Sequence, residues 1–191
     1  MVLTPAIEQS LSPEQGCWLL GCARYTIAQR LGVALPPPST PDLLLQEPAA
    51  CFVTLTLDGQ LRGCIGTLTA ERPLAEAVAY YAAAAAFEDP RFPPLTLPEW
   101  PSVAVEVSVL SAAVPVQAES EEALLAQLQP GVHGLIIERG AQRATFLPQV
   151  WESLPEPAQF LGQLKRKAGL DDSCPVAQLR CSIYTVNYFA E

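Results

Sequence analysis

The residues of this chain that are best suited to chemistry lie within five consecutive positions, from Arg62 to Gly66. Cys64 carries a thiol, which attacks electrophiles as a thiolate, and Arg62 stands two residues before it. Because side chains two positions apart in a strand share a face, the guanidinium of Arg62 would stabilise the thiolate of Cys64. We therefore expect a site in which Cys64 is the nucleophile or acid and Arg62, Gly63, Ile65 and Gly66 contact a substrate.

Each of these residues also has a purely structural interpretation. Cys64 is equally compatible with a small core residue, and glycines inside a strand are typical of a bulge or of a close approach by another group. An arginine that faces apolar neighbours requires a partner. That partner would be Glu106, Asp89 or a bound anion, since a carboxylate or phosphate suits the two-pronged guanidinium of Arg62.

Four residues outside this segment are further candidates. Glu106 stands among Val, Ala and Ser, where a carboxylate is either a general base or the ion-pair partner of Arg62 or Arg91. Asp89 and Arg91 flank a proline, and they either fix a rigid loop or form the rim of a cleft at the cysteine. His133, the only histidine, is either a loop residue or a base toward the thiol.

A hairpin is predicted to position the central cysteine. Val-, Thr- and Leu-rich residues 51–57 form the first strand, Asp58-Gly59 forms the turn, and residues 61–68 form the returning strand. With a two-residue turn, Leu55 would lie opposite Arg62 and Val53 opposite Cys64, on one face.

The remaining elements alternate helices with hairpins. A capping pattern at Ser12 begins a helix that Gly32 ends. The other expected elements are helices over 73–87, 119–128 and 157–168, with Lys165 outward, and a hairpin over 134–147. Strands are expected over 179–189 and over 103–110, where four alternating valines would share one face. Hairpins predict a mostly antiparallel sheet with packed helices, an α+β fold.

Composition excludes several classes of protein. The 191 residues are 50% hydrophobic with a net charge of -9, so the chain lacks the basic surface of a nucleic-acid-binding protein. No apolar run approaches the roughly 20 residues that span a bilayer, and no secretory signal precedes the first helix. Six cysteines without a C-x-x-C pair indicate free thiols, and we expect a cytoplasmic protein with no membrane association.

A metal or cofactor site is not expected. One histidine and scattered cysteines do not match the ligand spacing of zinc or iron sites. Nucleotide-binding and serine-hydrolase motifs are also absent from the sequence.

Several strings together resemble the AMMECR family. They are Leu61-Arg62-Gly63-Cys64-Ile65-Gly66, Phe87-Glu88-Asp89-Pro90-Arg91-Phe92, Glu106-Val107-Ser108-Val109-Leu110, Gly134-Leu135-Ile136-Ile137 and Thr145-Phe146-Leu147-Pro148-Gln149-Val150-Trp151. The resemblance implies a single AMMECR-type domain over residues 1–191, with two intimately associated, interleaved lobes. It also implies a Memo-like protein and a radical S-adenosylmethionine (SAM) protein as possible partners.

Two functions follow as hypotheses. In the first, the chain is an enzyme or catalytic subunit for a small anionic metabolite, with Glu106 as base. In the second, it is a non-catalytic binding or scaffold module for the Memo-like and radical SAM partners.

Overall fold

The computed structural model describes residues 11–191, and their chain divides into two compact units. Unit 1 holds the residues up to Ser111 together with Asn187–Glu191, and unit 2 holds Ala112–Val186. Each unit is built around one four-stranded sheet. The strand pairs β1–β2, β1–β3, β4–β7, β5–β6 and β5–β7 are all antiparallel. The prediction of an α+β fold with mostly antiparallel sheets is confirmed.

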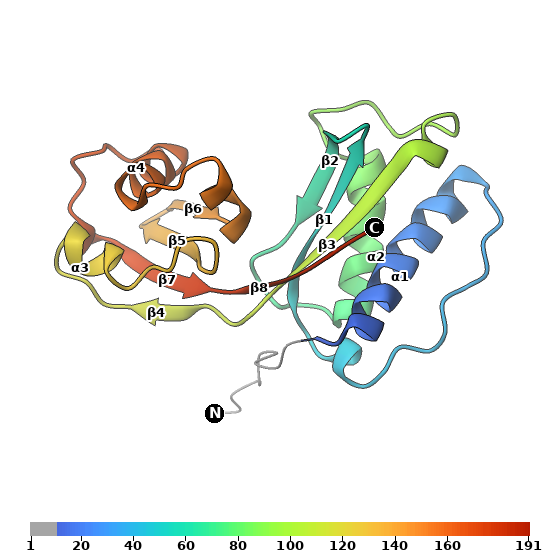
Figure 1. Cartoon of the computed structure of the whole chain (residues 1–191), viewed down its shortest axis with the longest axis horizontal. Helices are drawn as coiled ribbons and strands as arrows, with labels where there is room; N and C mark the ends of the chain where they lie inside the picture. The colour runs from blue at the N-terminus through green and yellow to red at the C-terminus, as the bar shows by residue number, and fades with distance from the viewer. Residues whose placement is uncertain (1–10) are drawn as a thin grey trace. The chain divides into compact units, whose positions relative to one another are not determined.

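Unit 1 has two helices on one face of its sheet, whose strand order is β2-β1-β3-β8 (Figure 1). Its elements are α1 (Pro13–Leu31), β1 (Ala50–Leu57), β2 (Gln60–Gly66), α2 (Leu74–Phe87), β3 (Val103–Leu110) and β8 (Val186–Ala190), with short 3₁₀ turns at Leu44–Gln46 and Trp100–Ser102.

Helix α1 begins and ends as its sequence predicts. The Ser12 hydroxyl accepts from the backbone N–H of Gln15, and the Gln15 side chain accepts from the backbone N–H of Ser12. Gly32 takes the left-handed conformation, with φ of 73°, that closes the last turn.

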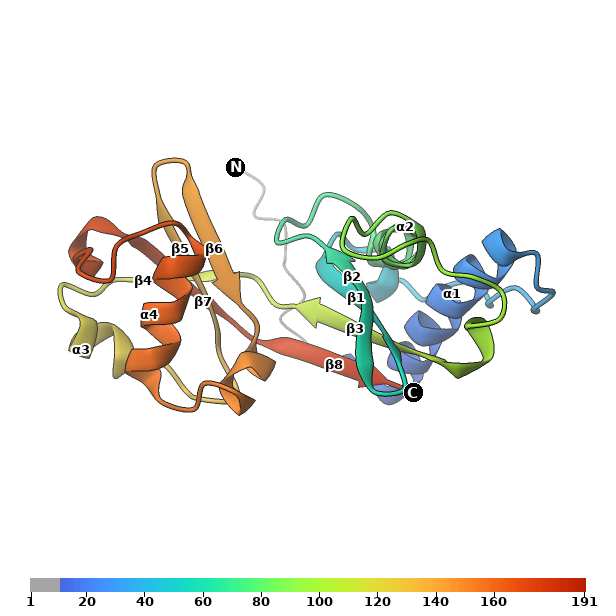
Figure 2. The ribbon, with the colours of Figure 1, turned by 90° about the horizontal axis from the view of Figure 1, so that it is seen from above.

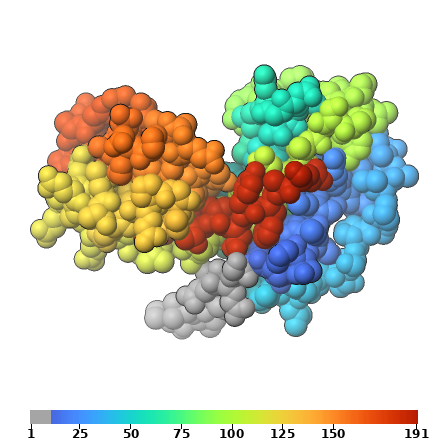
Figure 3. Space-filling model, viewed as in Figure 1, coloured from blue at the N-terminus to red at the C-terminus, as the bar shows by residue number. Residues whose placement is uncertain are grey.

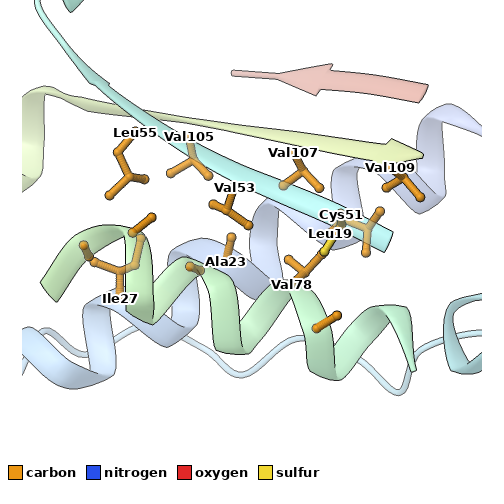
Figure 4. Packing of buried hydrophobic residues seen from close by; sticks show 14 of the residues in the cluster. Leu19, Ala23, Ile27, Cys51, Val53, Leu55, Val78, Val105, Val107 and Val109 are labelled. Carbon is orange, nitrogen blue, oxygen red and sulfur yellow. The ribbon is translucent and has the colours of Figure 1, made fainter. Parts of the chain in front are cut away.

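The core of unit 1 lies between the sheet and the two helices (Figure 4). Alternate residues of β1 and β3 point to the helices, and those of β3 are the four valines that the sequence pattern placed on one face. They meet Leu19, Ala23 and Ile27 of α1 and Val78 of α2. Within residues 11–191 no helix of unit 1 covers the opposite face of this sheet, and we call it the helix-free face.

The hairpin of β1 and β2 forms at the predicted turn but in another register. Asp58 and Gly59 both have positive φ, at 52° and 75°. Leu55 lies opposite Gly63, and Val53 lies opposite Ile65, because a β-bulge between Leu55 and Thr56 leaves Arg62 as an extra residue. The predicted pairs of Leu55 with Arg62 and Val53 with Cys64 are therefore wrong.

The C-terminal strand was predicted as one element and is two. Strand β7 (Arg180–Tyr184) belongs to the sheet of unit 2, and β8 completes the sheet of unit 1, where it runs antiparallel to β3 (Figure 2). The ring of Phe189 lies where a Cβ on Gly16 would stand, so β8 also contacts α1. In the space-filling view the red C-terminal residues accordingly lie against the blue first helix (Figure 3).

Unit 2 packs helix α4 and a short helix with a sheet of order β4-β7-β5-β6. Its other elements are β4 (Val114–Val116), α3 (Glu121–Leu125), β5 (Gly134–Arg139), β6 (Gln142–Phe146), α4 (Pro157–Lys167) and 3₁₀ turns at Pro148–Glu152 and Val176–Gln178. Trp151 and Phe160 stack at a ring separation of 3.7 Å in its core.

Lys165 was expected to face outward and is instead buried. Its ammonium donates to the carboxylate of Glu121 and to the backbone carbonyl of Asp172. This pairing explains how a lysine only 1% exposed is tolerated inside unit 2.

None of the helices within residues 11–191 has both the length and the apolar character needed to cross a membrane.

Gly63 lies against α2 so closely that it has no room for a side chain. A Cβ there would stand 2.1 Å from the carbonyl oxygen of Ala85. We predict that Gly63→Ala lowers the free energy of unfolding by about 1–3 kcal/mol, measured by urea denaturation, because the backbone of α2 must shift.

Gly21→Ala is the matched control, since a Cβ at Gly21 in α1 meets nothing within 4 Å. It should raise stability by about 0.5–1 kcal/mol, as expected for an exposed helical glycine. Equal effects of the two variants would contradict the tight contact between β2 and α2.

Candidate functional site

The five residues from Arg62 to Gly66 have different surroundings. Gly63 faces α2, Ile65 packs against the core, and a Cβ on Gly66 would meet the carbonyl oxygen of Cys51 at 2.3 Å. Cys64 lies opposite Thr54 and so belongs to the helix-free face. Other parts of the chain approach both glycines closely, as the sequence predicted. Gly63, Ile65 and Gly66 thus contact α2, the core and β1.

Arg62 is held by a carboxylate that the sequence did not indicate. Its Nε and Nη2 atoms donate to the two carboxylate oxygens of Glu99, at 2.8 and 3.2 Å. Glu99 also accepts from the backbone N–H and hydroxyl of Thr96. The expected ion-pair partners, Glu106 and Asp89, are not those found, and with Arg62 only 8% exposed we place no ligand on its guanidinium.

The outer edge of β2 is covered by two side chains of the loop after α2. The buried carboxylate of Asp89 accepts the backbone N–H of Cys64 at 2.9 Å, and Arg91 donates to the carbonyl of Cys64 at 3.1 Å. The side chains of Asp89 and Arg91 are themselves joined by two hydrogen bonds, which Nε of Arg91 donates at 3.0 Å and Nη2 at 2.7 Å. Arg91 thereby holds the pKa of Asp89 well below its usual range.

These contacts stand where a further strand would bind, so the edge of β2 is closed by side chains at Cys64. They also bring together three residues that were predicted to share a site: Cys64, Asp89 and Arg91. The side chain of Arg91 remains 53% exposed, so its guanidinium is accessible beside the cysteine.

Cys64, Thr54 and Glu106 form a row across three neighbouring strands, and we call it the Cys64 row. Thr54 lies opposite Cys64 on one side and opposite Glu106 on the other. The Thr54 hydroxyl donates to the Cys64 sulfur at 3.2 Å. Glu106 is half-buried, and its carboxylate makes no hydrogen bond or ion pair within residues 11–191. Neither ion-pair alternative for Glu106, with Arg62 or with Arg91, is therefore present.

Thr54 was missed at the sequence level although its position could be read there. Because side chains alternate along β1, Thr54 and Thr56 lie on one face of the strand, and Val53 and Leu55 lie on the other. The bulge, which was not predicted, places Thr54 opposite Cys64, where Val53 had been expected.

His133 belongs to unit 2, where its ring has a local role. Its Nδ1 accepts the backbone N–H of Gln129 at 3.2 Å, and its carbonyl accepts the indole N–H of Trp151. A role for His133 as base toward Cys64 stays a prediction.

The other cysteines are less suited to nucleophilic chemistry than Cys64, with the exception of exposed Cys17. Burial raises the pKa of Cys22 and of Cys181 to about 11 and that of Cys51 to about 12, so these thiols stay protonated near neutral pH. Cys174 is buried as well. In the described residues no three His, Cys, Asp or Glu side chains gather as metal ligands would.

Comparison with known proteins places this fold in a family. The family model described as AMMECR1 matches residues 20–189. The chain belongs to the AMMECR1 family. A crystal structure of the uncharacterised protein PH0010 from Pyrococcus horikoshii has the same fold, with a TM-score of 0.86 and 33% identity over 96% of this chain and 94% of that one.

Archaeal AMMECR1 relatives match most of the chain. A protein of Thermofilum pendens is 41% identical over 180 residues, which cover 85% of this chain and 82% of the relative. A protein of Methanothermobacter thermautotrophicus is 38% identical over 172 residues, covering 86% and 87%. Membership of the AMMECR1 family establishes the fold but not a reaction, and a single domain with interleaved lobes over residues 1–191 stays a prediction.

The ion pair of Arg62 with Glu99 predicts a pH dependence of stability. Hydrogen bonds from Arg62 and then Thr96 lower the pKa of Glu99 to about 2 from an ordinary 4.5. The stabilisation from this carboxylate is therefore complete above pH 4.5 and is lost as pH falls toward 2. Glu99→Gln should lower the free energy of unfolding by about 1–3 kcal/mol at pH 6 and by less at pH 3.

Urea denaturation at both pH values measures this difference. Glu152→Gln, which removes an exposed carboxylate, tests whether loss of one charge is enough to change the pH dependence. A deficit of Glu99→Gln that is the same at pH 6 and pH 3 would show that the ionised pair does not stabilise the fold.

Proposed function

We propose that the Cys64 row and the adjacent Arg91 form a small-molecule site in unit 1, at which Cys64 acts as nucleophile or acid on an anionic metabolite. The observation that carries this proposal is the half-exposed guanidinium of Arg91, which donates to the backbone carbonyl of the partly buried Cys64. A cation beside a sulfur favours its thiolate form, which is the reactive one.

Arg91 supports the choice of an anionic substrate. Asp89 and the carbonyl of Cys64 occupy its Nε and Nη2, while within the described chain Nη1 donates to no other group. A carboxylate or phosphate can accept from Nη1 while Asp89 holds the guanidinium in place. Since Asp89 balances the charge, recognition would depend on directed hydrogen bonds more than on net charge.

The position of Glu106 supports a role as a base that acts on the substrate and not on the thiol of Cys64. Two steps of ordinary spacing between opposed residues put the Cα atoms of Cys64 and Glu106 about 10 Å apart. A ligand that lies across β1 would contact the sulfur at one end and the unpaired carboxylate at the other. Acid–base chemistry at the far end is then the role of Glu106 in this proposal.

Family resemblance supports a joint action with a Memo-like protein and a radical SAM protein, and we include these partners in the proposal. The alternative function, a non-catalytic docking module for them, is favoured by exposed apolar side chains on the helix-free face. Leu61, opposite Thr56, is 46% exposed, and Tyr188, next to the helix-facing Phe189, is 48% exposed.

The small-molecule site predicts a ligand whose binding depends on Arg91. In a thermal-shift screen of inorganic phosphate, citrate and small dicarboxylates, an anion at about ten times its Kd should raise the wild-type Tm by about 3–5 °C. The same anion should leave the Tm of Arg91→Gln unchanged. Arg30→Gln is the matched control, because Arg30 is also a half-exposed arginine of unit 1 in an ion pair.

Loss of the shift in both variants, or in neither, would argue against Arg91 as the ligand-binding group. Retention of a Memo-like protein by Cys64→Ala but not by Leu61→Arg, in a co-purification with that defined partner, would favour the docking alternative.

A further inference from the structure

The hydroxyl of Thr54 lies 3.2 Å from the sulfur of Cys64 because of how their strands pair. The backbone N–H and carbonyl of Cys64 both point outward, to Asp89 and Arg91. Cys64 and Thr54 are therefore a non-hydrogen-bonded pair, the type in which opposed side chains approach most closely. The contact is thus fixed by the backbone of the sheet and does not depend on a flexible loop.

Within residues 11–191, the polar and charged groups around Cys64 lie on the neighbouring strands, on α2 and on the loop after it. The Thr54 hydroxyl of β1 donates to the sulfur. In the loop after α2, Arg91 contacts the carbonyl of Cys64, and Asp89 contacts its backbone N–H. Beyond Thr54, on β3, stands the Glu106 carboxylate. From the helix side, α2 presents the Ala85 carbonyl to Gly63.

We propose that Thr54 is the positioning residue of the Cys64 site, and that its hydroxyl stabilises the thiolate and aims the sulfur at the helix-free face. A hydroxyl that donates to sulfur favours the charged form over the thiol, because the thiolate is the better acceptor. This role rests on the proposed small-molecule site, to which it adds the residue that activates the nucleophile.

Thr54→Val removes the hydroxyl while it keeps the shape and the β-branch of the side chain. The variant thiolate loses one hydrogen bond and becomes more basic, so fewer molecules are ionised at pH 7, but each thiolate attacks faster. Alkylation of Cys64 by iodoacetamide should then be about two- to three-fold slower than wild type at pH 7 and about two-fold faster on the high-pH plateau. The two pH–rate profiles cross.

Alkylation is followed by mass spectrometry of the Cys64 peptide in the full chain, with the exposed thiol of Cys17 as internal reference. Thr54→Ser should restore the wild-type profile because it restores the donor. Thr56→Val is the matched control: Thr56 has the same strand, face and partial burial, but lies opposite Leu61. It should leave the Cys64 profile unchanged.

The proposal is supported if the pH–rate profile of Thr54→Val crosses that of wild type while the profiles of Thr54→Ser and Thr56→Val do not. A Thr54→Val profile that matches wild type, or that is raised or lowered by one factor at every pH, overturns it, because a purely structural change alters access equally at all pH values. Serine that fails to restore the profile overturns it as well. If the profiles cross while the anion screen finds no ligand, Thr54 keeps its role toward the sulfur and the small-molecule site is the part that fails.

Discussion

The buried carboxylate of Asp89 is the contact on which the arrangement around Cys64 depends. It accepts the backbone N–H of Cys64 in the edge strand β2 and forms an ion pair with Arg91, which in turn donates to the carbonyl of Cys64. In this way two side chains satisfy the outward backbone groups of Cys64, and an edge that would otherwise invite another strand is closed. The same carboxylate fixes the beginning of the segment that later supplies Glu99 to Arg62.

In the segment from Arg62 to Gly66, four residues stabilise the fold and the fifth, Cys64, lies on the helix-free face. Four of its residues serve the fold: an arginine bound to Glu99, a glycine against α2, an isoleucine in the core and a glycine against β1. Their contacts join β2 to the neighbouring elements, and the side chain of Cys64 lies on the helix-free face. A short motif can therefore be constrained by the fold itself in four of its five positions.

Local patterns predicted most elements, and long-range contacts account for what they missed. The cap at Ser12, the turn at Asp58-Gly59 and the alternating valines of β3 are set by neighbouring residues, and they are present as predicted. The bulge at Arg62 is not determined by its neighbours alone, because it lets the guanidinium reach a carboxylate 37 residues later in the chain. The burial of Lys165 likewise depends on Glu121, 44 residues away. The expected neighbours of Cys64 were shifted for the same reason, although the structure does bring Cys64, Asp89 and Arg91 into contact.

The return of the chain to unit 1 through β8 has a consequence for its synthesis. On the ribosome, β3 is made before all of unit 2, whereas the strand that pairs with its free edge emerges only afterwards. Until then the nascent polypeptide exposes a row of unpaired backbone groups on β3 and an unfilled hollow over Gly16. The sheet that carries Cys64 is thus completed only after unit 2 has been translated.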